Sequence, residues 1–404
     1  CPHCGKSTGF TKEEDTLDGW FDSGSTHFAA MKKDQGFWPA TMYLEGLDQY
    51  RGWFQSSLLT AVGAFGEGAP FKECVTHGWT VDGEGRAMHK SLGNGVDPAD
   101  IFNENGADIL RLWAASADYH ADVRCSKAIF QQLSQNYLKF RNTCKFMLDN
   151  LVDFDPAHLT KAEDMPVLDR WLITKLNELI EKVEQSYNDY EFHIITHAVN
   201  DFCVTTLSSF YLDIVKDRLY CEAADSAERR SAQTALYLTL STLAKLFAPI
   251  LAFTCDEIWL AMPHTAEDDA RNVVLNDMNK PFTAYALDAE TMARWEHIIE
   301  VRTAVNGALE EARAAKVIGK SLEADVHLTV PEGDVFLADE NPAALADLFI
   351  VSKVELTVGG ELAVKVENAA GTKCPRCWKH SLTPNAEGLC PRCAEVVRHL
   401  PDLL

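Results

Sequence analysis

The sequence lacks the features that mark membrane, secreted and broadly nucleic-acid-binding proteins. Its most apolar stretch, LYLTLSTLAKLFAPILAFTCDEIWLAM, is interrupted by Lys245, Asp256 and Glu257, so no apolar run is long enough to span a bilayer. No signal peptide or low-complexity tract is visible. Positive charge is scarce, because 37 Lys and Arg residues face 60 Asp and Glu residues and leave a net charge of −23. We therefore expect a soluble cytoplasmic protein in which any contact with nucleic acid uses a local basic surface.

A disulfide framework is not indicated either. Six of the twelve cysteines lie in Cys-x-x-Cys pairs, and six are scattered singly through apolar stretches. This pattern is typical of reduced thiols and metal sites in a cytosolic protein. The chain begins with Cys1 inside such a pair rather than with Met, and we expect its natural N-terminus to lie upstream. The single cysteines are predicted to be small core residues: Cys74, Cys125, Cys144, Cys203, Cys221 and Cys255.

What the sequence does contain predicts a multidomain protein with α/β and all-helical parts. Its 404 residues allow two to four domains. In residues 1–116, the strand-like runs TMYLEGL and ECVTHGWTV alternate with the helix-like run WFQSSLLTAVGAF, which predicts an α/β domain with parallel strands. Residues 117–300 space their apolar side chains by three and four and predict a helical bundle. We expect a small α/β segment at 301–366 and a metal-binding knuckle at 367–404.

The strongest local motif is a double Cys-x-x-Cys pattern near the C-terminus. Two such pairs separated by twelve residues can place four thiolates tetrahedrally around one Zn²⁺ ion, and four protein ligands make a zinc site structural rather than catalytic. The predicted ligands are Cys374, Cys377, Cys390 and Cys393. The pair Cys1 and Cys4 is half of the same kind of site, and a second zinc ion there is a further possibility.

Two groups of cations are candidates for contact with nucleic acid. The knuckle carries Arg376, Trp378, Lys379, His380 and Arg392, whose chemistry suits phosphate contact and base stacking but equally a structural rim. The stretch 126–147 contains no acidic residue. On a helix it could form a face that contacts the nucleic-acid backbone, or a basic face that is only solvated. Its basic residues are Lys127, Lys139, Arg141 and Lys145.

The run MYLEGLDQYRGWFQSSL places polar side chains directly after a predicted strand. Ligands of parallel sheets bind at the carboxyl ends of strands. There the carboxylates of Glu45 and Asp48 can hold an ammonium group and ribose hydroxyls, and the amide of Gln49 can both donate and accept. Trp53, and Trp20 in the run DGWFDSG, offer flat walls for an aliphatic side chain, although a tryptophan is more often a core residue.

The stretch GRAMHKSLGN places Lys90 and Ser91 between glycines. One interpretation is a surface turn. The other is a mobile loop whose backbone N–H groups and ammonium neutralise charge on a phosphate group during a reaction.

Taken in order, several motifs resemble the C-terminal half of a bacterial isoleucyl-tRNA synthetase. They are DTLDGWFDSG, YLEGLDQYRGWF, HGWTVDGEGRAMHKSLGN, FYLDIVKDRLY, LFAPILAFTCDEIW and the closing CPRCW and CPRC knuckles. The resemblance covers essentially the whole chain. It implies the distal part of a Rossmann-type class I catalytic domain, a helical anticodon-binding bundle and a zinc knuckle. It also implies isoleucine activation with ATP and Mg²⁺, transfer to tRNA(Ile), and a monomeric protein.

The resemblance implies a role for each candidate residue. AMHKS lies where the family has its Lys-Met-Ser-Lys-Ser loop, so Lys90 is the expected catalytic lysine, and His89 and Ser91 are expected to contact ATP beside it. The loop departs from the family pattern at Ala87 and His89. The resemblance assigns the aminoacyl-adenylate to Glu45, Asp48, Gln49, Trp20 and Trp53.

Two alternatives remain open at this point. One is a relative that charges valine, and the other is a tRNA-binding paralogue without catalysis. The family's His-containing ATP signature and editing insertion lie upstream of the matching motifs and do not occur in this sequence. We therefore expect the chain to be inactive by itself.

Overall fold

A computed structural model describes residues 1–334, 337 and 342–400. The chain divides into two compact units. The first comprises Cys1–Asp97 and Ala117–Ile129, and the second comprises Pro98–Ser116 and Phe130–Leu404. None of the described helices is long and apolar enough to cross a membrane.

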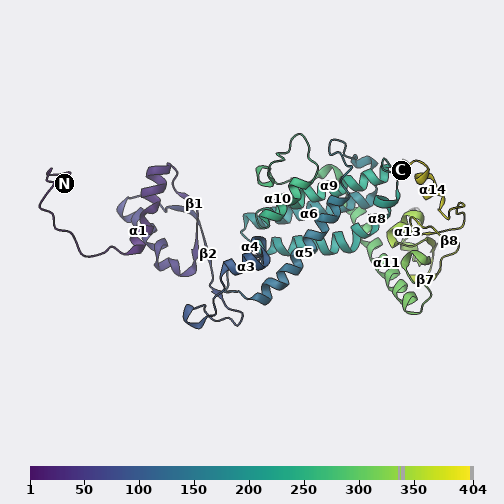
Figure 1. The fold of residues 1–404 in the computed structure, drawn as a ribbon, viewed down its shortest axis with the longest axis horizontal. Coiled ribbons are helices and arrows are strands. Elements are labelled where there is room, and N and C mark those ends of the chain that lie inside the picture. Colours follow the sequence, from purple (N-terminus) through teal and green to yellow (C-terminus); the bar gives the residue numbers. More distant parts are fainter. Residues whose placement is uncertain (335–336, 338–341, 401–404) are drawn as a thin grey trace. The chain divides into compact units, whose positions relative to one another are not determined.

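The first unit is an α/β structure built around two parallel strands (Figure 1). β1 (Ala40–Gly46) pairs with β2 (Phe71–His77) in a register that sets Glu45 opposite Thr76. The connection between them contains the short 3₁₀ helix η2 (Leu47–Arg51), α2 (Trp53–Leu59) and the π-helical turn η3 (Thr60–Ala64). β3 (Thr80–Val81) pairs in parallel with β4 (Val123–Arg124). The predicted parallel strands and the helix between them are confirmed.

Close helix packing positions the strands of the first unit. α1 (Gly19–Thr26) begins at Asp18, whose carboxylate accepts the backbone N–H of Trp20 at 2.9 Å, and it continues into the π-helix η1 (His27–Gln35). A Cβ atom on Gly24 would lie 2.5 Å from the Cβ of Ser56, so α1 approaches α2 at a distance that only glycine allows. Beneath α2, Tyr43 is buried and its hydroxyl shares a 2.8 Å hydrogen bond with Ser57.

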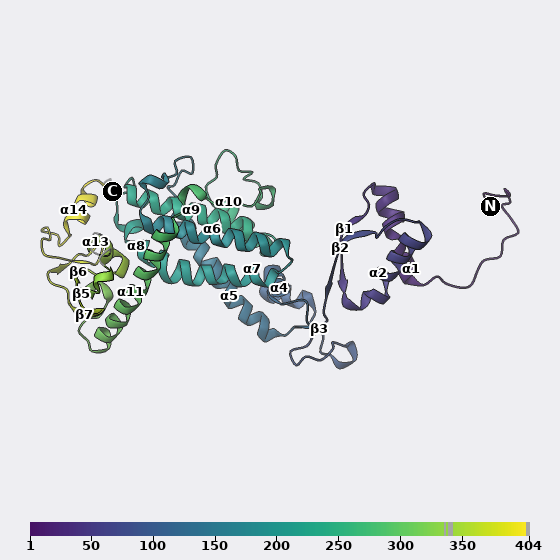
Figure 2. The ribbon, with the colours of Figure 1, turned by 180° about the vertical axis from the view of Figure 1, so that it is seen from behind.

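The second unit is a helical bundle whose long helices lie side by side (Figure 2). Every residue of α9 from Ser231 to Ala244 is buried, which makes α9 the centre of the bundle. α6 packs against α7 and α9, and α9 also contacts α8 and α10. The bundle's elements are α5 (Lys127–Asp149), α6 (Val167–Asn188), α7 (Phe192–Asp201), η6 (Phe202–Tyr211), α8 (Leu212–Cys221), α9 (Ala227–Phe247) and α10 (Ala252–Ala261).

A buried carboxylate ties three helices of the bundle together. Asp169 on α6 is fully buried and accepts hydrogen bonds from Tyr211 at 2.8 Å, Ser231 at 2.5 Å and Arg218 at 3.2 Å. Arg218 neutralises the carboxylate, and the two hydroxyls satisfy its remaining lone pairs. Removing one partner of such a pair costs about 3–5 kcal/mol. The network therefore fixes how α6, α8 and α9 pack.

Two short helices that precede the bundle in sequence pack with it. They are α3 (Pro98–Asn105) and α4 (Ala107–Ser116). Asp108 on α4 accepts the backbone N–H of Thr254 at 2.8 Å and its hydroxyl at 2.6 Å, so it caps the first turn of α10. Arg111 donates to the carbonyls of Ile250 and Pro249 at 2.9 and 2.6 Å. The expected boundary between residues 116 and 117, like the other expected domain limits, stays a prediction.

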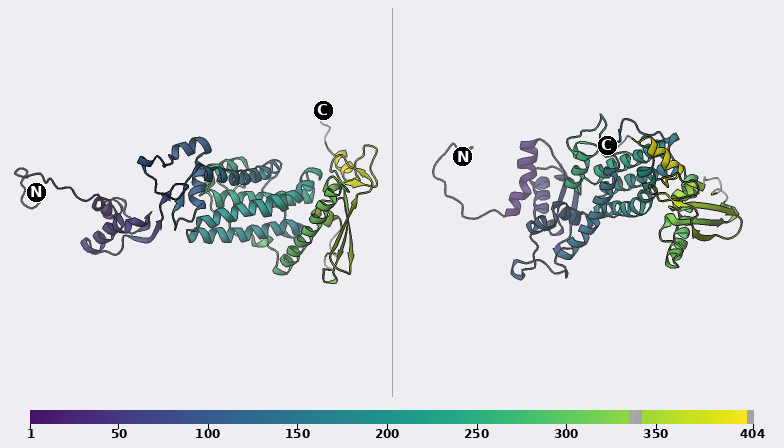
Figure 3. Two further views of the ribbon diagram at one scale, coloured as in Figure 1. Left: turned by 90° about the horizontal axis from the view of Figure 1, so that it is seen from below. Right: turned by 45° about the vertical axis from the view of Figure 1, so that its right-hand side comes forward.

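After the bundle, α11 (Ala289–Ala314) contacts a three-stranded sheet (Figure 3). The strand order is β6 (Lys353–Val358), β5 (Ala324–Val330), β7 (Ala363–Asn368), with β5 parallel to β6 and antiparallel to β7. β5 alternates buried and half-buried residues, as its sequence predicts. The sequence did not indicate β7 or α13 (Pro342–Phe349). The knuckle follows, with the short pair β8 (Thr372–Lys373) and β9 (His380–Ser381) and then α14 (Pro391–Arg398).

The cysteine predictions are confirmed with one exception. Cys125, Cys144, Cys203, Cys221 and Cys255 are buried, but Cys74 is exposed on β2. Its neighbours on that strand, Glu73 and Val75, are exposed and half-buried. The prediction for Cys74 was wrong because an apolar run shows that a strand exists but not how much of it is covered.

Candidate functional site

Polar side chains gather where β1 ends. The Glu45 carboxylate accepts the backbone N–H of Gly46 at 3.0 Å, and its side chain is 47% exposed. His77, at the end of the neighbouring strand, holds its Nε2 atom 3.9 Å from the Glu45 carboxylate. Asp48 and Gln49 lie in η2 directly after the strand, where the Gln49 amide donates to Asp48 at 3.3 Å. The strand end is therefore an open, acceptor-rich rim, and the binding role expected for its residues stays a prediction.

Gln49 and Trp53 are fixed by a turn that requires glycine. The Gln49 side-chain oxygen accepts the backbone N–H of Trp53 at 3.2 Å, at the start of α2. A Cβ atom on Gly52 would lie 2.1 Å from this oxygen, so a side chain at residue 52 would displace Gln49. The Trp53 ring lies 4.6 Å from the Tyr43 ring, which places it partly in the core. Trp20 is 45% exposed on the first turn of α1.

The Lys-Ser loop is an ordered turn with an exposed lysine. Lys90 and Ser91 begin the 3₁₀ helix η4 (Lys90–Leu92), and both are exposed. His89 is extended, and its backbone N–H donates to the side chain of Asn94 at 2.9 Å. Gly93 ends the turn with φ of 61°, a conformation that favours glycine. Lys90 has no ion-pair partner within the described part of the chain.

Asp82 and Asn94 hold the two ends of this loop together. One oxygen of the Asp82 carboxylate accepts the backbone N–H groups of Glu84 and Arg86 at 3.0 and 2.9 Å. The other accepts the Arg86 guanidinium and the Asn94 amide, each at 2.9 Å. The hydrogen bonds from Asn94 and from Arg86 hold the pKa of Asp82 well below its usual range. We call this arrangement the Asp82–Asn94 clasp.

Sequence reasoning did not single out the clasp. A signal was present, because Asp and Asn beside a glycine-rich turn commonly bind backbone groups of that turn. Because the two residues are twelve positions apart in the sequence, their contact could not be inferred from local spacing.

The basic face expected on α5 is smaller than its sequence implies. Lys139 and Arg141 are exposed on α5. Lys145 instead forms an ion pair with Asp149 at 2.7 Å, one helical turn later. Asp149 lies two residues beyond the stretch 126–147, so the sequence prediction did not take this partner into account. The free cationic surface therefore centres on Lys139 and Arg141.

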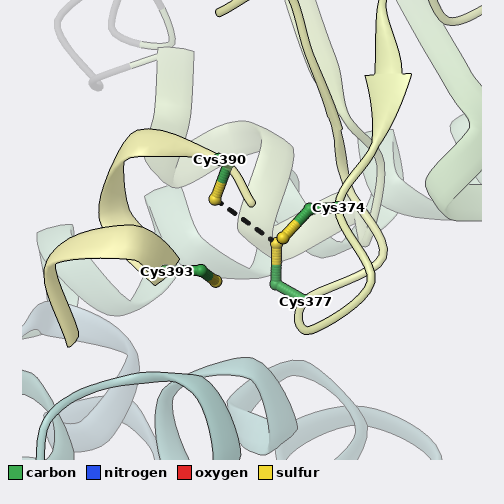
Figure 4. A group of neighbouring side chains, drawn as sticks. All are labelled: Cys374, Cys377, Cys390 and Cys393. Atoms are coloured by element: carbon green, nitrogen blue, oxygen red, sulfur yellow. Dashed lines mark hydrogen bonds between the residues drawn. The ribbon is translucent and has the colours of Figure 1, made fainter. Parts of the chain in front are cut away.

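The four knuckle cysteines form one cluster (Figure 4). Their sulfur atoms all lie within 4.8 Å of one another, and Cys377 and Cys390 are 3.8 Å apart. A tetrahedral zinc site with Zn–S bonds of about 2.3 Å has sulfur atoms about 3.8 Å apart. Cys374 and Cys377 come from the loop after β8, whereas Cys390 is the N-cap of α14 and Cys393 lies in its first turn. The donor set therefore fits a closed zinc site.

Backbone groups around the cluster favour the thiolate form at one ligand. Burial raises the pKa of Cys374, but the backbone N–H groups of Cys377, Cys390 and Arg376 outweigh it and lower this pKa to about 6. A deprotonated sulfur is the form that binds zinc. Cys1 and Cys4 are exposed, and among the described residues they belong to no group of three or more candidate ligands. A second zinc ion there stays a prediction.

Three cations of the knuckle are half-buried and paired with other parts of the protein. Arg392 forms a bidentate ion pair with Asp217 on α8 at 2.6 and 2.9 Å. Lys379 pairs with Asp347 on α13, and Arg376 donates to carbonyls at the end of α8. These contacts favour a structural rim, and phosphate contact by these residues stays a prediction. Trp378 remains 53% exposed, with the ammonium of Lys320 5.3 Å from its ring.

Two families match this sequence. The family described as tRNA synthetases class I (I, L, M and V) matches residues 4–126, which include the strand end and the Lys-Ser loop. The family described as anticodon-binding domain of tRNA ligase matches residues 169–328, which include most of the bundle. The chain belongs to the class I tRNA synthetases.

Curated relatives of this synthetase chain carry the name isoleucine–tRNA ligase. The protein from Moorella thermoacetica is 47% identical over 99% of this chain, and the one from Desulforamulus reducens is 49% identical over 98%. The one from Syntrophotalea carbinolica is 48% identical over 98%. The chain spans 44–45% of the length of these relatives. The family resemblance noted in the sequence is thereby confirmed.

A solved structure supports the fold alone. LeuRS from Agrobacterium radiobacter K84, in a ternary complex with tRNA and LeuAMS, superposes with a TM-score of 0.55 at 16% identity. The match covers 91% of this chain and 38% of that protein. The predicted fold class is confirmed: part of a class I catalytic domain, a helical anticodon-binding domain and a C-terminal cysteine cluster that fits a zinc knuckle.

Proposed function

We propose that the protein acts in the ATP-dependent activation of isoleucine to its adenylate and in the transfer of isoleucine to tRNA(Ile). The observation that carries this proposal is the 45–49% identity to isoleucine–tRNA ligases along nearly the whole chain. The rim at the end of β1 and the exposed Lys90 add chemistry suited to the same reaction.

The strand end would bind the aminoacyl-adenylate. The Glu45 carboxylate is half exposed and can accept hydrogen bonds from the substrate ammonium group. Asp48 and Gln49 would hold ribose hydroxyls, because their mutual hydrogen bond orients an acceptor and a donor side by side. Trp53 and Trp20 would flank the aliphatic side chain. Trp53 is preorganised for this role because its backbone is held by Gln49.

The Lys-Ser loop would act on the phosphates of ATP. Breaking the bond between the α- and β-phosphates develops negative charge on the departing pyrophosphate, which a positioned ammonium group stabilises in the transition state. Lys90 supplies that group, with His89 and Ser91 beside it, and Mg²⁺ would neutralise further phosphate charge. The clasp holds the loop backbone so that Lys90 projects from a fixed turn.

The bundle and knuckle would serve tRNA recognition. The anticodon-binding match supports a tRNA partner, and the exposed pair Lys139 and Arg141 is the cationic surface that we assign to the RNA backbone. The cysteine cluster would hold one structural Zn²⁺ ion. We further propose that the protein is a cytoplasmic monomer, in keeping with its family.

Isoleucine-dependent ATP–pyrophosphate exchange by the full-length gene product tests the proposal. Lys90→Ala is expected to lower the exchange rate by about 100- to 1000-fold, the scale for removing one transition-state charge partner. The KM for isoleucine should change little, because the strand end supplies that binding. His89→Ser, a control in the same loop, should have a mild effect.

Three results would contradict the proposal. Exchange stimulated by valine instead of isoleucine would indicate the valine-charging alternative. No exchange with either amino acid, combined with intact tRNA binding, would indicate the paralogue without catalysis. An unchanged rate of ATP–pyrophosphate exchange in Lys90→Ala would indicate that the Lys-Ser loop is only a surface turn.

A further inference from the structure

Arg376 lies between the cysteine cluster and the end of helix α8. Its guanidinium donates to the backbone carbonyl of Cys221 and, at 3.2 Å, to that of Tyr220. The nitrogen that donates to Cys221 also lies 3.7 Å from the sulfur of Cys393 and donates to it. One side chain therefore contacts both a candidate zinc ligand and the last turn of a bundle helix.

Hydrogen bonds between the knuckle and the end of α8 run in both directions. The thiol of Cys221 donates to the backbone carbonyl of Arg376 at 3.8 Å. Cys221 is buried in one cluster with Cys374, Cys377 and Cys393. α8 ends at Cys221, and Glu222 is extended, so the last carbonyls of the helix have no partner within the helix itself. Arg376 supplies that partner, together with a positive charge at the negative end of the helix dipole.

Charge balance gives Arg376 a second reason for its position. Four thiolates around one Zn²⁺ ion carry a net charge of −2. Cys374, Cys377 and Cys393 are buried, so nearby cations must compensate this charge in place of water. Arg376 contacts a sulfur atom directly, and N–H groups that donate to metal ligands orient them and tune metal affinity.

We infer that Arg376 is a positioning residue that couples zinc binding in the knuckle to ordering of the end of α8. With zinc bound, the Cys393 thiolate would hold the guanidinium in the position from which it caps the carbonyls of Tyr220 and Cys221. In the reverse direction, the capped helix end holds the guanidinium beside the thiolates and raises their affinity for zinc. The inference rests on the proposed zinc site. Arg392 attaches the other half of the knuckle to α8 through Asp217, so the knuckle keeps one anchor when Arg376 is changed.

Zinc affinity tests the first half of this coupling. Competition with a chromogenic chelator is expected to show that Arg376→Ala weakens zinc binding by about 10- to 100-fold, the usual effect of losing a residue that orients metal ligands. Arg376→Lys should recover part of the loss, because it keeps the charge but not the forked donor. Arg398→Ala is the matched control, because Arg398 lies on α14 and pairs only with Glu395 among the described residues. Equal affinity in Arg376→Ala and the wild type would overturn the inference.

Hydrogen exchange tests the second half. Removing zinc from the wild-type chain should speed exchange of the amides at 219–222, and in Arg376→Ala these amides should exchange fast even with zinc bound. Unchanged exchange at 219–222 after zinc removal from the wild type would overturn the coupling, whether or not the variant folds. A wild-type chain that binds no zinc would overturn the metal site itself, which distinguishes that failure from failure of the coupling.

Discussion

We expect the conformation of the Lys-Ser loop to depend on Asp82. Its carboxylate accepts four hydrogen bonds, two from the backbone of Glu84 and Arg86 and two from the side chains of Arg86 and Asn94. Asp82→Ala removes all four, whereas Glu84→Ala removes only an exposed contact with Arg86 at 3.3 Å. Because solvent replaces part of each lost bond, we expect the variant to open the loop at least about tenfold more often.

Hydrogen exchange in this chain measures loop opening directly. The amides of Glu84, Arg86 and His89 are each bound to a clasp side chain, so they should exchange at least about tenfold faster in Asp82→Ala. Glu84→Ala, the control in the same loop, should leave the amides of Arg86 and His89 near the wild-type rate. In the full-length gene product, Asp82→Ala should lower the ATP–pyrophosphate exchange rate and leave the KM for isoleucine almost unchanged.

The sign of the pH dependence follows from the lowered pKa of Asp82. A carboxyl group whose pKa falls on folding stabilises the folded loop at pH values above its ordinary value of 3.8, and this contribution is lost as the pH falls further. The loop should therefore stay closed at neutral pH and open only in strong acid. Equal exchange of these three amides in the wild type and Asp82→Ala would refute the clasp.

Three further predictions concern zinc, tRNA and acid stability. Metal analysis should find about one zinc ion per chain, lost when any of the four knuckle cysteines is replaced; a full complement in such a variant would contradict the site. Charge reversal of Lys139 and Arg141 should weaken tRNA binding and its salt dependence, whereas reversal of Lys145 should do so less, because Asp149 already neutralises it. Hydrogen bonds from Arg229 and Gln233 outweigh the effect of burial and lower the pKa of Asp153 to about 2. The stability that Asp153 contributes is therefore present above pH 3.8 and is lost as the pH falls toward 2. In urea denaturation, Asp153→Asn should lower the free energy of unfolding by about 1 kcal/mol at neutral pH, a small value because solvent partly screens the Asp153–Arg229 pair. The free energy of unfolding of the variant should also depend less on pH between 2 and 4.

Local patterns predicted most elements of the fold and the four cysteines that form the cluster. Strand β1, helix α2 and the long bundle helices follow from the spacing of apolar residues within a few turns, so no distant partner was needed to recognise them. The two-residue spacing within each Cys-x-x-Cys pair is itself enough to predict that its two sulfur atoms can face one metal ion. β7 and α13 were not predicted because each is stabilised by partners distant in the sequence. β7 pairs with β5 across a gap of more than thirty residues, and α13 packs on β6 and α11.

Long-range partners explain what the sequence left open at the candidate sites. The role of Arg392 is decided by Asp217, which lies 175 residues earlier. The role of Arg376 is decided by Cys221, which lies 155 residues earlier. From sequence alone, either arginine beside its Cys-x-x-Cys pair could bind phosphate. Only the fold shows that Arg392 is paired with a carboxylate and that Arg376 is bonded to the end of a helix.

The assignment of these cations changes where tRNA contact is expected. The knuckle cations Arg376, Arg392 and Lys379 are bonded to α8 and α13. The group of the knuckle that is most accessible to RNA is therefore the exposed ring of Trp378. On the proposed function, we expect phosphate neutralisation by a chain of net charge −23 to come from cations without acidic partners among the described residues, such as the exposed pair on α5. Charge reversal on α5 is therefore the direct test of backbone contact. A charge change in the knuckle would first disturb its attachment to the bundle, so a loss of tRNA binding there would not identify a contact.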